Sequence, residues 1–188
     1  IAGAGVQWLR DKMKFFKKAP ETEKIIKSLK DNSDVYLVPA FTGLGAPYWD
    51  SNSRGVLSGL TRNTGPKEII RATVESVAYQ TYDLFEAMKH DGLKPRLVKV
   101  DGGMVTNNWF SQFLSDVVNV GVLRPRVKET TALGAAFMAG LQIGVYKSLK
   151  DISNKWSLDK KFSPKMKNKD RAQLLKGWSK AIKRTLIN

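Results

Sequence analysis

Apolar residues recur three or four positions apart over several stretches of the chain, which is the spacing of an amphipathic helix. Near the start, Val6, Leu9, Met13 and Phe16 follow this spacing and predict a helix over residues 4–16. Pro20 follows and ends it, because proline cannot continue a helix. Comparable patterns and end signals predict further helices over residues 21–30, 67–89, 107–118, 131–143, 148–156 and 170–186.

Short apolar runs bounded by turn residues predict strands between these helices. The runs cover residues 35–39, 55–60, 97–100 and 120–123, whereas residues 160–167 are expected to form a polar connector. Strands that alternate with helices are typical of an α/β fold. We therefore expect a mixed sheet with helices packed on its faces.

Two segments have an unusual composition. The loop over residues 40–54 is rich in glycine and aromatic residues, and we favour a structural role for it over a catalytic one. The helix expected over residues 131–143 is dense in alanine and glycine, which lets another backbone approach closely. This density favours either tight core packing or a helix at a domain hinge.

Length and composition limit the class of protein. A chain of 188 residues is long enough for one domain with a hydrophobic core. It has no cysteine, which excludes a disulfide framework and thiolate chemistry and fits a reducing, cytoplasmic location. No apolar run approaches membrane-spanning length, so we expect no membrane partner. A start at Ile1 indicates the remainder of a longer protein.

The formal net charge of +15 raises the question of a nucleic-acid partner. The excess is mostly lysine, scattered over the polar faces of the predicted helices. Scattered lysines are more typical of a solvated surface than of a nucleic-acid footprint. We therefore expect no specific nucleic-acid binding, although weak binding to polyanions at low salt would follow from the charge.

The strand at residues 97–100 ends at Asp101 and is followed by Gly102, Gly103 and then the helix that begins at Asn107. A turn of this kind places backbone N–H groups and a helix N-terminus at the carboxyl end of a strand, where open α/β sheets bind nucleotides. Gly103 would offer its N–H without a side chain in the way, and the Asn107 amide can donate or accept a hydrogen bond. Gly102 is expected to support the turn and Asp101 to orient it.

Other residues with possible chemistry carry weaker signals. His90 is the only histidine and lies at a helix exit, so we expect it to be exposed to solvent rather than catalytic. Asp50, Asp101 and Asp116 could ligate a metal, but their spacing forms no recognisable metal site. We therefore assign no metal ligand in this chain.

Several longer motifs resemble the FGGY family of carbohydrate kinases. Residues 55–60 (Gly-Val-Leu-Ser-Gly-Leu) and, seven residues later, residues 68–75 (Glu-Ile-Ile-Arg-Ala-Thr-Val-Glu) are similar to the second signature of the family. Within the family, the glycerol kinase branch is the one that residues 2–11, 39–50, 100–108 and 129–136 resemble. The resemblance covers essentially the whole chain and thins after Tyr146.

This resemblance implies the α/β actin-like ATPase fold, related to ribonuclease H, in which ATP and substrate meet in a cleft between two domains. Residues 1–188 would then be a partial C-terminal, nucleotide-binding domain, with the N-terminal domain and the start of this domain absent. Gly3, Gln7, Gly103 and Asn107 match the family's ATP-binding positions. No catalytic residue is assigned here, because the family's general-base aspartate falls in the missing part.

The implied reaction is the phosphorylation of glycerol by ATP to glycerol 3-phosphate, with Mg²⁺ bridging the phosphates. The expected partners are glycerol, the missing N-terminal domain and further copies in a dimer or tetramer, and the chain alone is expected to be inactive. The alternatives are another FGGY sugar kinase such as a xylulokinase, a basic nucleic-acid-binding module, or an enzymatically dead regulatory domain. Intact Gly102, Gly103 and Asn107 argue against the last alternative.

Overall fold

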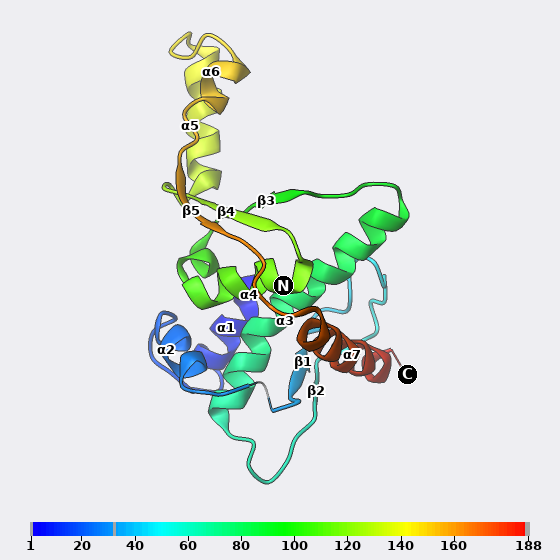
Figure 1. The fold of residues 1–188 in the computed structure, drawn as a ribbon. Coiled ribbons are helices and arrows are strands. Elements are labelled where there is room, and N and C mark those ends of the chain that lie inside the picture. Colours follow the sequence, from blue (N-terminus) through cyan, green and yellow to red (C-terminus); the bar gives the residue numbers. More distant parts are fainter. Residues whose placement is uncertain (1, 32, 187–188) are drawn as a thin grey trace.

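The computed structural model describes residues 2–31 and 33–186 of the chain. Its body is built around one long helix, α3 (Pro66–His90), which runs through the centre of Figure 1. Helices from both ends of the chain pack around α3, and most of the buried apolar side chains lie between them. These helices are α1 (Ala2–Asp11), α2 (Glu21–Lys27), α4 (Asn108–Val118) and α7 (Asn168–Thr185).

The strands form two small sheets rather than one. In the first, β1 (Tyr36–Val38) pairs antiparallel with β2 (Val56–Ser58). In the second, β4 (Gly121–Pro125) lies between β3 (Leu97–Lys99), to which it is parallel, and β5 (Leu158–Phe162), to which it is antiparallel. The second sheet is therefore mixed, as expected, and helices cover part of it.

Strand β5 corrects the prediction of a polar connector over residues 160–167. Its sequence, Leu-Asp-Lys-Lys-Phe, has charged residues in the middle, and only Phe162 is buried. β5 lies at the edge of its sheet, where lysines are common because they discourage pairing with other chains. The pairing with β4, and not the pattern of the segment itself, makes it a strand.

The first helix is shorter than the spacing of its apolar residues predicts. α1 ends at Asp11, and Lys14 adopts a left-handed conformation with φ of 59°. Phe16 is nevertheless buried, so the chain turns back towards the core after the helix ends. A periodic apolar pattern can thus continue past a helix end when the next segment packs on the same core.

Helices α5 (Thr130–Gln142) and α6 (Leu149–Ser153) form an arm that extends away from the body at the top of Figure 1. Of the α5 residues only Gly140 is buried, although the helix is rich in apolar residues. Gly140 packs closely on the Tyr146 ring, where a Cβ atom would lie 2.7 Å away, but the other alanines and glycines of α5 are not buried in the described part of the chain. Strand β3, near the base of the arm, has no strand beyond it among the described residues.

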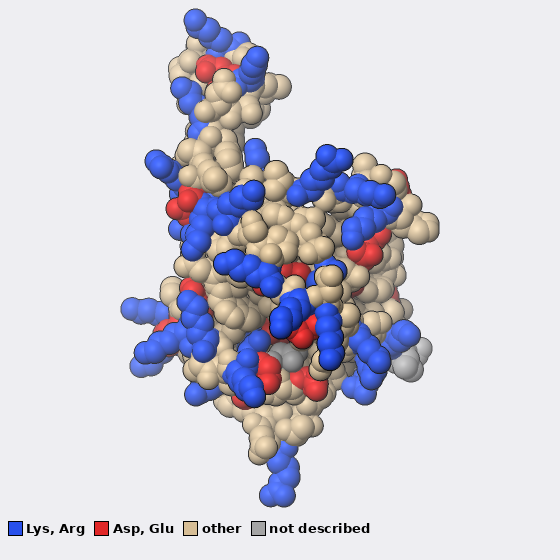
Figure 2. Space-filling view, viewed as in Figure 1, with Lys and Arg blue, Asp and Glu red and all other residues tan. Residues whose placement is uncertain are grey.

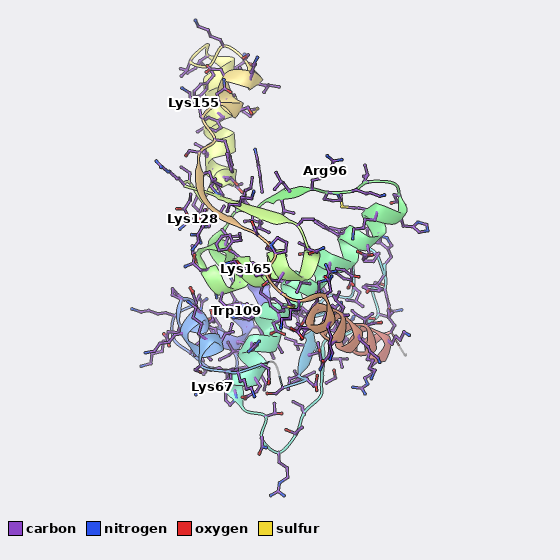
Figure 3. The ribbon with its side chains drawn as sticks, viewed as in Figure 1. Lys67, Arg96, Trp109, Lys128, Lys155 and Lys165 are labelled. Atoms are coloured by element: carbon purple, nitrogen blue, oxygen red, sulfur yellow. The ribbon has the colours of Figure 1, made fainter. Side chains whose placement is uncertain are left out.

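Basic side chains are spread over the molecule. Figure 2 shows lysine and arginine on both the body and the arm, with acidic residues between them on the face drawn. Figure 3 places Lys155 on the arm, Lys128 near its base and Lys67 at the other end of the body. None of the helices in the described part of the chain combines the length and apolar character needed to span a bilayer.

Candidate functional site

The first wall of the site is the exposed face of α1. Gly3 and Gln7 lie four residues apart and therefore on the same side of the helix. The opposite side, which includes Leu9, is buried in the core. Gly5 allows this packing to be close, because a Cβ atom there would lie 2.9 Å from Cγ2 of Thr73 on α3. The core packing of α1 thus turns Gly3 and Gln7 outward.

The second wall is the Gly-Gly turn after β3. Gly102 has φ of 83° and ψ of −179°, a conformation essentially restricted to glycine, and its N–H donates to Lys128 O at 2.9 Å. Gly103 begins the short 3-10 helix η1 (Gly103–Thr106), so its N–H has no partner within that helix. A Cβ atom at Gly103 would meet open space. Gly103 thus presents an unshielded backbone N–H, whereas Gly102 shapes the turn.

Asn107 joins η1 to α4. It is the N-cap residue of α4, and its Oδ1 accepts a hydrogen bond from Phe110 N at 2.9 Å. The N–H of Asn108 donates to Glu23 Oε2 at 3.3 Å. The first turn of α4 is therefore already capped, by the side chains of Asn107 and Glu23. The backbone donor exposed at this end of the site is therefore the N–H of Gly103, not an N–H of the first turn of α4.

A pocket of 520 Å³ lies between these walls. Gly3, Gln7, Gly103 and Asn107 all line it, so the structure brings together the four residues that the sequence proposed for nucleotide binding, from segments about 100 positions apart. The volume falls within the usual range for small-molecule sites. The remaining lining residues are Val6, Arg10, Ala19, Pro20, Thr22, Glu23, Val74, Met104 and Thr106.

The lining combines an apolar floor with a polar rim, the usual character of a cofactor site. Val6, Val74 and Met104 give the pocket an apolar lining, with Val6 and Val74 themselves almost fully buried. The amides of Gln7 and Asn107 can each donate and accept hydrogen bonds. Together with the Gly103 N–H, these groups suit a ligand with one apolar, one hydrogen-bonding and one anionic part.

Residues 1–143 match the C-terminal domain of the FGGY family of carbohydrate kinases. The chain belongs to the FGGY family. Glycerol kinase 1 of Pseudomonas aeruginosa is 54% identical over 184 residues, which are 98% of this chain and 37% of that protein. Glycerol kinase of Clostridium botulinum is 50% identical over 187 residues, 99% of this chain and 38% of that protein. The chain thus spans little more than a third of the length of these curated relatives.

Solved FGGY kinases have the same fold. A crystal structure of Plasmodium falciparum glycerol kinase with ADP matches the whole chain with a TM-score of 0.86 and 37% identity, and the match covers 37% of that chain. Xylulose kinase from Lactobacillus acidophilus matches 97% of this chain with a TM-score of 0.76 at 24% identity, over 37% of its own length. The expected α/β actin-like ATPase fold is confirmed.

The second FGGY signature, residues 55–60 and 68–75, packs beneath the pocket and holds α3 in place. Gly59, with φ of 85°, lies where a Cβ atom would overlap the carbonyl of Asp34. Glu75 is fully buried, pairs with Arg71 at 2.7 Å and accepts a hydrogen bond from the Tyr79 hydroxyl at 3.0 Å. Val74, between these groups on α3, reaches the pocket. The signature residues of this FGGY chain therefore fix α3, and through it one wall of the site.

Arg71 also contacts Trp109, which Figure 3 labels in the middle of the body. The guanidinium carbon lies 5.2 Å from the centre of the Trp109 ring, and that ring stacks on Phe113 at 4.9 Å. These contacts tie α3 to the first turn of α4, immediately beyond Asn107. The FGGY signature is thus linked to both walls of the pocket.

The remaining candidates have structural roles. Asp101 accepts a hydrogen bond from the Thr130 hydroxyl, which links the Gly-Gly turn to the start of α5. Asp50 binds the hydroxyl of Ser53 at 2.6 Å within the glycine-rich loop, and Asp116 accepts from Lys165 N at 2.6 Å. His90 is exposed, as expected. In residues 2–31 and 33–186, no three His, Cys, Asp or Glu side chains are grouped closely enough to hold a metal ion.

Sequence reasoning did not identify Arg10, Thr22 and Glu23 as lining residues. Arg10 lies one helical turn beyond Gln7 and pairs with Asp11 at 2.6 Å. Thr22 and Glu23 follow Pro20 at the start of α2, and their sequence pattern is that of an ordinary first helical turn. Only the packing of α2 beside α4, 85 positions further along the chain, brings them to the pocket.

Proposed function

We propose that this chain is the nucleotide-binding part of a glycerol kinase, which transfers the γ-phosphoryl group of ATP to a glycerol hydroxyl. The observation that carries the proposal is the single pocket lined by Gly3, Gln7, Gly103 and Asn107. The names of the relatives support glycerol as the acceptor, and the ADP in the Plasmodium falciparum enzyme supports a nucleotide as the ligand.

Each of these four residues has a role in this proposal. Gly103 lines the pocket, and its missing side chain leaves room for a phosphate oxygen to approach its N–H closely. The amides of Gln7 and Asn107 hold the adenosine and phosphate region by hydrogen bonds. Gly3 leaves the start of α1 open, since a Cβ atom there would also meet free space. These groups bind and orient the nucleotide.

The residues of the pocket do not form a dedicated Mg²⁺ site. Among the described residues, Glu23 is the only carboxylate that lines it, and this side chain already pairs with Lys27 at 2.6 Å. Mg²⁺ is commonly held by substrate phosphates, water and one or two carboxylates. We propose that the ion enters with ATP, and we assign it no ligand in the described residues.

Catalysis needs groups that this chain does not supply. In the proposed reaction a carboxylate accepts the proton of the glycerol hydroxyl, while positioning and charge neutralisation do most of the work. We assign that carboxylate and the glycerol contacts to the part of the full-length protein outside these residues. Closure of the two parts around the substrates would exclude water and limit ATP hydrolysis.

The arm offers a surface for the rest of the full-length protein. Met138, Ile143 and Val145 are 52%, 77% and 63% exposed, and the outer edge of β3 is unpaired among the described residues. The relatives are more than twice as long as this chain, so we propose that the rest of the polypeptide covers this surface. Slower hydrogen exchange in α5 of the full-length protein than in the 188-residue chain would support the contact, and equal rates would contradict it.

A xylulokinase-like activity is the second candidate. The structural likeness to xylulose kinases rests on 24% identity and supports only the fold, whereas the match to a glycerol kinase reaches 54%. Specificity resides in acceptor contacts that we place outside this chain. Assembly into a dimer or tetramer and a cytoplasmic location stay predictions.

A substrate panel on the full-length protein tests the proposed function. ADP release should depend on glycerol and should be far slower with xylulose or with no acceptor. ADP release that responds to xylulose but not to glycerol would establish the second candidate. ATP binding without any acceptor-dependent turnover would contradict both.

A further inference from the structure

The N-terminal turns of α2 and α4 meet beside the pocket. Thr22, which is 4% exposed, donates its hydroxyl hydrogen to Ala19 O at 2.7 Å. The Asn107 side chain lies next to it, with Nδ2 at 3.5 Å from Thr22 Oγ1. The hydroxyl of Thr22 thus accepts from Asn107 while it donates to Ala19.

Asn107 is held at both ends of its side-chain amide. Its Oδ1 accepts from Phe110 N at 2.9 Å, so its Nδ2 must face Thr22. An amide nitrogen carries two hydrogens, and the Thr22 contact uses one of them. The second hydrogen is free to meet a ligand in the pocket, in an orientation that Thr22 and Phe110 have already set.

Glu23 acts on the same junction from the backbone side. Its Oε2 accepts from Asn108 N at 3.3 Å, and its Oε1 accepts from Lys27 at 2.6 Å. Burial by itself would raise the pKa of Glu23, but the hydrogen bonds from Lys27 and from the backbone of α4 outweigh it and lower the pKa. The carboxylate therefore stays charged at neutral pH and caps the first turn of α4.

We propose that Thr22 and Glu23 are positioning residues for the nucleotide site, which hold Asn107 and the start of α4 in the geometry that binds the ligand. Both side chains also line the pocket, so α2 is one of its walls. A ligand group that is oriented in advance costs less free energy to immobilise on binding. The inference rests on the proposed nucleotide site and adds α2 to the elements that position the ligand-binding groups.

Substitutions at Thr22 test the inference in the full-length protein. Thr22→Val removes the hydroxyl with little change in volume, and Thr22→Ser keeps the hydroxyl as the matched control. We expect Thr22→Val to raise the Kd for ADP and the KM for ATP by about three- to tenfold, the usual effect of one hydrogen bond. The KM for glycerol should not change, and Thr22→Ser should restore nucleotide affinity.

A second pair of variants covers the case in which Thr22→Val does not fold. Glu23→Gln keeps an acceptor for Asn108 N, and Glu23→Ala removes it. We expect Glu23→Ala to weaken ADP binding about three- to tenfold and Glu23→Gln to weaken it less. Equal ADP affinity in both members of a folded pair would overturn the inference, as would a lower melting temperature with unchanged ADP affinity.

Gly103→Val separates this inference from the proposed function. If Gly103→Val abolishes ADP binding while Thr22→Val and Glu23→Ala bind ADP normally, α2 has no positioning role and the nucleotide site stands. If Gly103→Val also binds ADP normally, the proposed site itself is wrong, and the inference falls with it.

Discussion

Two adjacent glycines in the turn after β3 have different tasks. Gly102 adopts a backbone conformation that other residues rarely reach, whereas Gly103 has an ordinary backbone and an open space where a side chain would be. The sequence predicted that the pair mattered for a ligand. It also assigned the two tasks, with Gly102 supporting the turn and Gly103 offering its N–H. What it could not give was the positive φ of Gly102, because that angle depends on how η1 packs after the strand.

Gly102→Ala tests the first task. A Cβ atom at position 102 meets no neighbour, so the whole cost comes from the backbone conformation, which is about 1–3 kcal/mol for a residue other than glycine. We expect the free energy of unfolding to fall by that amount in urea titration. An unchanged midpoint of urea unfolding would contradict the prediction, because it would show that alanine fits this turn without backbone strain.

Most of the elements follow from local patterns, and the exceptions depend on distant packing. The long helix α3 lies within one residue of its predicted bounds, because its apolar face and Gly92 are local signals. Strand β5 and the early end of α1 were missed, since pairing with β4 and the turn at Lys14 decide them. The four proposed site residues came from family motifs, and the Gly-Gly turn itself also pointed to Gly103 and Asn107. Thr22 and Glu23 were not predicted, because only the fold brings α2 to α4.

The contact between α7 and β1 depends on a glycine. A Cβ atom at Gly177 would overlap the ring of Tyr36, so Gly177→Ala should destabilise the chain although alanine favours a helix. Gly134→Ala on α5 is the matched control, since a Cβ atom there meets open space and should stabilise by about 1 kcal/mol. Thermal unfolding should therefore shift in opposite directions. A shift in the same direction for both variants would contradict the account of the α7 contact.

A half-buried carboxylate on α3, Asp83, contacts Trp178 of α7 and predicts a pH dependence. Burial raises the pKa of Asp83, although hydrogen bonds from Trp178 and Tyr48 oppose the shift. The folded state therefore holds the proton more tightly than the unfolded state, and the free energy of unfolding falls as pH rises from the unfolded pKa through the folded pKa.

Asp83→Asn should remove this part of the pH dependence. The free energy of unfolding of wild type and variant is measured by urea titration at a series of acidic pH values. As pH rises, the variant should become more stable relative to wild type. The groups that titrate in both proteins cancel in the difference between the two free energies. A difference that does not vary with pH would contradict the proposed burial effect.

At the scale of the whole molecule, the arm exposes apolar surface that nothing in the described part of the chain covers. Its apolar residues Met138, Ile143, Val145 and Leu149 are all more than half exposed, and exposed apolar surface of this kind favours association. We expect the 188-residue chain to self-associate with rising concentration in sedimentation velocity. Ile143→Asn combined with Val145→Asn should weaken the association, and a wild-type monomer at every concentration would contradict the prediction.

The central claim is that the pocket between α1 and η1 binds the nucleotide of a glycerol kinase. Glycerol-dependent ADP release by the full-length protein tests it most directly, in wild type, Gly103→Ala and Gly103→Val, with Gly45→Val as a control at another open position. We predict activity that falls as the side chain at position 103 grows, at an unchanged melting temperature and with Gly45→Val near wild type. Full activity in folded Gly103→Val would contradict the account.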